Sequence, residues 1–158
     1  EIQNKVRGIA SDTNVAKVSV LGLEPGFTTS AELFEELANA DISVDVIVQN
    51  IGSSGKSDIT FTVKRTDLYK SLDIVNQLKE SIGVDKVLSS SNVAKVTIVG
   101  AGMQDAPGYA AKMFRAISDQ GIDIETITTS EIRITCIIDE ARLKDAVQSL
   151  HSAFELEK

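Results

Sequence analysis

Tryptophan is absent from the 158 residues, and the chain has only one cysteine, one histidine and two prolines. A single cysteine excludes a disulfide within the chain, and one cysteine with one histidine is too few for a structural zinc site. We therefore predict no metal and no cofactor in this chain. Cys136 alternates with Ile134 and Ile138, a pattern typical of a small buried core residue.

Positive charge is also scarce, because 16 Lys and Arg face 23 Asp and Glu, for a net charge of -7. Binding to nucleic acid or to an anionic membrane needs clustered Lys and Arg, so we expect neither as a partner. No apolar run reaches the length of a membrane span, and residues 1–7 are too polar for a signal peptide. We therefore expect an intracellular, cytoplasmic protein.

The chain contains an internal repeat. Residues 18–22 return as residues 96–100, and residues 42–48 return as residues 122–128. Apolar residues alternate in the strand segments and recur at helical spacing between them, which gives each copy the order βαββαβ. This order predicts an α+β fold of two tandem ferredoxin-like sandwiches.

The second copy lacks a sixth element, because only residues 155–158 follow its last helix. Residues 6–10 read as a spare strand, and we expect this N-terminal strand to complete the second sheet by covering its open edge. The predicted domains are therefore residues 15–90, and residues 91–158 together with 1–14. Units this small bury little surface, which favours contact between copies or dimerisation.

Catalytic motifs are incomplete. Residues 55–57 (Gly-Lys-Ser) imitate the end of a phosphate-binding P-loop, but Asn50 stands where its first glycine is needed. Residues 100–102 (Gly-Ala-Gly) begin like a dinucleotide fingerprint, but the next glycine, Gly108, comes too late. No nucleophile with a base is evident, so we predict no catalytic residue. A small ferredoxin-like hydrolase is an alternative.

Two loops lead into predicted helices, at residues 25–30 and 107–111. Backbone N–H groups and the helix dipole favour a carboxylate at such a place. A zwitterionic amino acid would also need acceptors for its ammonium group. The acceptors on the strands that follow are Asp45, Gln49, Asp123 and Glu131. Ordinary helix caps would explain the same loops, so both interpretations stay open.

Five segments, in order and with matching spacing, resemble the regulatory region of aspartate kinase, which is a tandem pair of ACT domains. The segments are residues 6–10, 44–50, 58–63, 99–103 and 128–134. The resemblance covers nearly the whole chain and includes no kinase domain, so we expect the separate regulatory β subunit or an excised form of it. A regulatory ACT subunit of another amino-acid enzyme, such as acetolactate synthase, is the alternative.

The resemblance implies feedback control of amino-acid biosynthesis. Free L-threonine, L-lysine or both would bind between ACT domains, in a homodimer that inhibits the catalytic α subunit of aspartate kinase. By position, one effector pocket would use Thr28, Thr29, Ser30 and Gln49 with Ile122, Asp123 and Ile124. The other would use Gly108, Tyr109 and Ala110 with Ser43, Asp45, Thr129, Ser130 and Glu131.

The first copy departs from the family at one place. Pro25 and Gly26 stand two residues earlier than the family's Pro-Gly, so that Phe27 and Thr28 take the usual Pro-Gly position.

Overall fold

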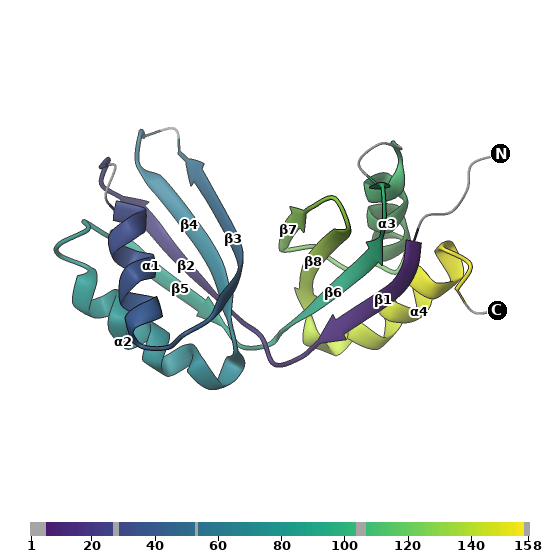
Figure 1. Cartoon of the computed structure of the whole chain (residues 1–158), viewed down its shortest axis with the longest axis horizontal. Coiled ribbons are helices and arrows are strands. Elements are labelled where there is room, and N and C mark those ends of the chain that lie inside the picture. The colour runs from purple at the N-terminus through teal and green to yellow at the C-terminus, as the bar shows by residue number, and fades with distance from the viewer. Residues whose placement is uncertain (1–5, 27–28, 53, 104–106, 157–158) are drawn as a thin grey trace. The chain divides into compact units, whose positions relative to one another are not determined.

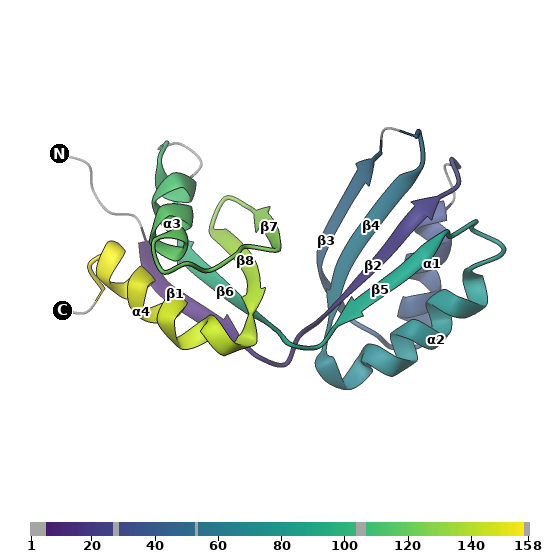
Figure 2. The same ribbon diagram turned by 180° about the vertical axis from the view of Figure 1, so that it is seen from behind.

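The computed structural model describes residues 6–26, 29–52, 54–103 and 107–156. The chain divides into two compact units. Unit 1 combines residues 1–13 with residues 92–158, and unit 2 is residues 14–91. Figure 1 and, from behind, Figure 2 show the elements of each unit.

Unit 2 is a βαββαβ sandwich. Its elements are β2 (Ala16–Leu23), α1 (Thr29–Asn39), β3 (Val44–Ile51), β4 (Ser57–Val63), α2 (Leu68–Leu78) and β5 (Lys86–Ser90). The sheet is antiparallel with the strand order β3-β4-β2-β5, and both helices cover one of its faces (Figure 1). The sheet confirms the predicted ferredoxin-like topology.

The core of unit 2 follows from the two periodicities of its sequence. Val18 and Val20 are two residues apart on β2, so both side chains face the helices, where they are fully buried with Phe61. Leu33 and Leu37 are four residues apart on α1 and point into the same core with no exposure. Each such side chain contributes about 1.5–3 kcal/mol through burial.

Unit 1 repeats this build with one element taken from the other end of the chain. Its elements are β1 (Val6–Asp12), β6 (Val93–Gly100), α3 (Tyr109–Ser118), β7 (Thr126–Thr129), β8 (Arg133–Asp139) and α4 (Leu143–Ala153). The strand order is β1-β6-β8-β7. Both α3 and α4 contribute buried residues to one core with the sheet, and Figure 2 shows the two helices of this unit from the reverse side.

The N-terminal strand completes the second sheet, as predicted. β1 pairs antiparallel with β6, from Val6 opposite Gly100 to Asp12 opposite Lys95. It thus takes the place that β5 holds beside β2 in unit 2. Val6 is 1% exposed and belongs to the core of unit 1.

β7 begins at Thr126, four residues after the start of the repeated segment 122–128, whose alternation favours a strand from Ile122 on. Ile122 N–H bonds to the carbonyl of Ile117 at the end of α3 (3.4 Å), and the Ile122 side chain is buried in the core. The alternation therefore starts before the strand pairing does. In the part of the chain that the structure describes, no helix has the length and apolarity to cross a membrane.

Candidate functional site

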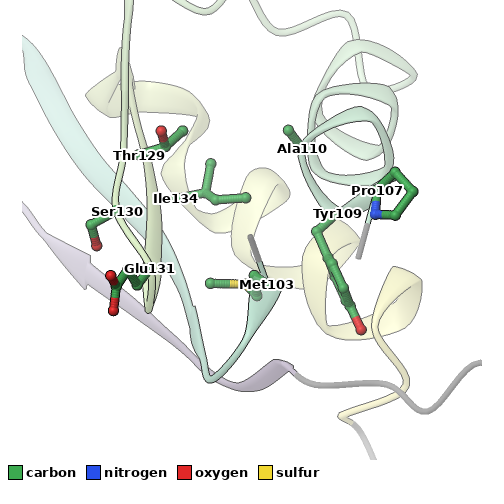
Figure 3. Close-up of a pocket in the computed structure, with 9 residues that line it drawn as sticks. Met103, Pro107, Tyr109, Ala110, Thr129, Ser130, Glu131 and Ile134 are labelled. Carbon is green, nitrogen blue, oxygen red and sulfur yellow. The ribbon is translucent and has the colours of Figure 1, made fainter. Parts of the chain in front are cut away.

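A pocket of about 500 Å³ lies in unit 1, between the start of α3 and the adjoining ends of β7 and β8. Figure 3 shows the side chains that line it from both sides. Its lining residues are Met103, Pro107, Gly108, Tyr109, Ala110, Thr129, Ser130, Glu131 and Ile134.

The helix side of the pocket carries partial positive charge. Gly108 occupies the N-cap position of α3 with φ 102°, and it has no side chain that could cap the first turn. The helix bonds begin with Lys112 N–H donating to the Gly108 carbonyl at 2.9 Å. The helix dipole and the N–H groups of the first turn make this end attractive to an anion.

The strand side carries hydroxyls and a carboxylate, and a tight turn holds them in place. Ser130 N–H donates to the Arg133 carbonyl (2.8 Å), and Arg133 N–H donates to Ser130 Oγ (3.2 Å). This turn follows Thr129, the last residue of β7, and carries the exposed side chain of Glu131. The strand side of the pocket therefore carries hydrogen-bond acceptors, and Figure 3 draws the Ser130 and Glu131 side chains at the edge away from α3.

The floor of the pocket is apolar and packed. Met103 and Ile134 are each 5% exposed and belong to the core of unit 1. The Tyr109 ring stacks on Phe154, with centroids 6.5 Å apart and 16° between the planes. The Lys112 ammonium lies 5.2 Å from the centroid of the same Phe154 ring. The buried Phe154 thus packs against two residues of α3, Tyr109 and Lys112, and holds the start of this helix in place.

Together these groups form a bipolar site. A carboxylate fits the start of α3, a cation fits Glu131, and an apolar group fits Met103 and Ile134. A free amino acid carries a carboxylate, an ammonium group and a side chain on one carbon atom.

Six residues of the second predicted pocket line this site: Gly108, Tyr109, Ala110, Thr129, Ser130 and Glu131. The other two, Ser43 and Asp45, lie in unit 2 and are both exposed: Ser43 directly precedes β3, and Asp45 is the second residue of that strand. The grouping of these two with the six stays a prediction.

The first predicted pocket is also divided between the units. Thr28 lies outside the described residues, and Thr29 and Ser30 begin α1. Ser30 Oγ donates a hydrogen bond to Gln49 Oε1 at 3.1 Å, so these two residues do meet. The remaining three lie in unit 1 between α3 and β7, and they are the buried Ile122, the exposed Asp123 and the half-buried Ile124.

Three lining residues were missed by the sequence reasoning: Met103, Pro107 and Ile134. Ile134 looks like any alternating core residue, and Met103 looks like part of a glycine-rich loop. Only the loop preceding α3 gave a usable signal, through Pro107 next to Gly108.

Cys136 is fully buried in the core of unit 1, which confirms its prediction as a core residue. Burial disfavours the thiolate and raises the thiol pKa from 9.0 to about 12. Because the unfolded chain loses this proton at a lower pH, the stability of unit 1 should fall as pH rises from 9 toward about 12.

We expect iodoacetamide at pH 8 to leave Cys136 unlabelled in the folded chain and to label it fully in denaturant. The thiolate is the reactive form, and burial also blocks the reagent. Mass spectrometry reads this directly, because the chain has a single cysteine. Labelling of the native chain at the rate of a free thiol would show that the core is open at this strand.

Comparison with known proteins agrees with this architecture. The ACT domain family matches residues 96–154. Aspartokinase 2 of Bacillus subtilis (strain 168) is 39% identical over 153 residues, which cover 97% of this chain and 37% of that protein. The chain thus spans little more than a third of the length of this curated relative.

Two solved structures match almost end to end. A chain in the crystal structure of aspartokinase alpha and beta subunits is 39% identical, with a TM-score of 0.88, covering 95% of this chain and 99% of that one. The ligand-free regulatory subunit of aspartate kinase from Thermus thermophilus is 33% identical, with a TM-score of 0.89 and the same coverage.

The chain is thus a tandem pair of ACT domains, each a four-stranded antiparallel sheet with two helices. It belongs to the aspartokinase family, as the sequence resemblance predicted, and it is similar to the regulatory subunit over 95% of its length.

Proposed function

We propose that this chain is a non-catalytic, cytoplasmic regulatory subunit of aspartate kinase. It binds free L-threonine, L-lysine or both, and it thereby mediates feedback inhibition of aspartate-family amino-acid biosynthesis. Its partners are a second copy of the chain, which forms a homodimer through the ACT domains, and the catalytic α subunit. The match to a structure of aspartokinase alpha and beta subunits supports a catalytic partner.

The observation that carries the proposal is the bipolar pocket at the start of α3. The effector carboxylate accepts hydrogen bonds from the first-turn N–H groups beyond Gly108, and its ammonium group contacts Glu131 and the hydroxyl of Thr129. The effector side chain rests on Met103 and Ile134.

Regulation follows from a difference in affinity between two states of the kinase. An effector that favours the inhibited state by about 1–3 kcal/mol changes the affinity for a second ligand about 5- to 150-fold. No catalytic group of this chain is needed for such an effect, because the effector acts only through binding.

We expect L-threonine or L-lysine to raise the melting temperature of the purified chain. Ligand at about one hundred times its Kd stabilises the folded form by about 2.7 kcal/mol. Glu131→Gln should weaken binding about 10- to 150-fold, because a hydrogen bond to a charged group contributes about 1.5–3 kcal/mol. The melting curve and its dependence on effector concentration give both values.

Asp73→Asn is the matched control, because it makes the same change of charge at an exposed position on α2 in unit 2. It should leave the effector response unchanged. A chain whose melting temperature ignores both amino acids at millimolar concentration would refute the effector assignment.

A further inference from the structure

The registers of the two sheets define which residues are equivalent in the two units. Val20 is the cross-strand partner of Ile59 in unit 2, and Ile98 is the cross-strand partner of Ile134 in unit 1. Val20 and Ile98 also hold the same place in the repeated strand segment. Ile59 and Ile134 are therefore equivalent.

The next strand and the first helix extend this equivalence to the pocket. Gln49 faces Ile59, and Thr129 faces Ile134, so Gln49 corresponds to the pocket residue Thr129. Ser30 is the second residue of α1, and Ala110 is the second residue of α3. Unit 2 thus places Ser30 and Gln49 where unit 1 places two residues that line its pocket.

Ser30 and Gln49 bond to each other. Ser30 Oγ donates to Gln49 Oε1 at 3.1 Å, and this bond joins the start of α1 to β3. In unit 1 Ala110 has no hydroxyl to offer Thr129, and both residues line the pocket instead. The bond in unit 2 therefore crosses the position that is open in unit 1.

The equivalent positions at the edge of the pocket carry charges of opposite sign in the two units. Lys56 stands three residues before Ile59, as Glu131 stands three residues before Ile134. Lys56 Nζ lies 3.3 Å from Glu24 Oε1 and 3.2 Å from each carboxylate oxygen of Asp85. The Asp85 carboxylate, and then that of Glu24, raise the pKa of Lys56 above its ordinary value.

The loops that hold Lys56 are closely packed. Gly22 has φ +69° and Gly83 has φ +67°, and a Cβ would collide with Asp85 at the first and with Glu24 at the second. Glu24 N–H also donates to the Gly83 carbonyl at 3.2 Å. This packing places both carboxylates beside the Lys56 ammonium.

We propose that the effector occupies unit 1 alone, and that the equivalent position in unit 2 is closed from within by the Ser30–Gln49 bond and the Lys56 ion pairs. In unit 2 an amino acid would have to displace the Ser30 hydroxyl from Gln49, and the carboxylates of Glu24 and Asp85 are already paired with Lys56. The chain therefore binds one effector molecule, and its two repeats differ in role. This inference rests on the proposed function.

Calorimetric titration of the full chain with L-lysine and with L-threonine tests the inference. We expect one molecule bound per chain. The double variant Ser30→Ala with Gln49→Thr removes the contact in unit 2. It should leave the Kd of the unit 1 site within twofold of the wild-type value. The reciprocal variant, Ala110→Ser with Thr129→Gln, installs that contact in unit 1 and should weaken binding at least tenfold.

Two molecules bound per wild-type chain, or loss of binding in the unit 2 variant with normal binding in the unit 1 variant, would overturn the inference and leave the proposed function standing. An absence of heat from the wild-type chain with both amino acids would instead contradict the proposed function, and the inference with it. Circular dichroism of each variant separates loss of binding from loss of folding.

Discussion

Replacing Phe154 with alanine is expected to lower the free energy of unfolding of unit 1 by about 3–5 kcal/mol. The ring is fully buried, stacks on Tyr109 and lies under the Lys112 ammonium, so its removal leaves a cavity behind the helix side of the pocket. Domains of this size have only about 5–15 kcal/mol of total stability. Urea unfolding followed by circular dichroism measures the loss.

Phe61→Ala is the matched variant, because Phe61 is the fully buried ring of unit 2, packed edge-on against Phe34 at 5.7 Å. Labelling of Cys136 reports on unit 1 alone. We expect Phe154→Ala to accelerate this labelling strongly and Phe61→Ala to do so much less. A Phe154→Ala chain that unfolds within 1 kcal/mol of the wild type would contradict the packing described for unit 1.

Deleting residues 1–13 is expected to prevent stable folding of unit 1. The deletion removes β1, the buried Val6 and every backbone bond between β1 and β6, and it turns the apolar strand β6 into an unprotected edge. The amide spectrum should keep dispersed signals from unit 2 and lose those of unit 1.

A circular permutant that carries residues 6–14 after residue 158, through a short glycine-serine linker, is the control. It restores the order in which β5 follows α2 in unit 2. We expect this permutant to fold like the wild-type chain. A truncated chain with an unchanged melting curve would mean that β1 is not part of the sheet of unit 1.

Much of the fold could be predicted from the sequence, because the spacing of apolar residues differs between the strands and the helices of each copy. Alternation in the strands and the three-to-four spacing of Leu33, Leu37, Leu143 and Val147 gave the element order of both units. Counting elements then showed that the second copy needed the strand at Val6, and the register of β1 on β6 confirmed it. The start of β7 could not be predicted from the alternation. Ile122 fits the alternating pattern because its side chain is buried in the core, although it lies before the strand.

The candidate site was only partly predictable. Gly108 and its neighbours carried a local signal, since glycine readily adopts the positive φ found at the N-cap of α3. The contact between Ser30 and Gln49 carried none, because it depends on the register of β3 on β4 and on two side-chain conformations. The same holds for Met103, whose loop gives no hint that its side chain forms the pocket floor.

The most direct test of the account is the two-dimensional amide spectrum of the labelled chain during titration with L-threonine and with L-lysine. We predict saturable shifts of the Ala110, Thr129 and Glu131 amides, at the two sides of the pocket in unit 1, while the Ser30 and Gln49 amides move little. Spectra that stay unchanged at millimolar effector, or saturable shifts confined to Ser30 and Gln49, would contradict it.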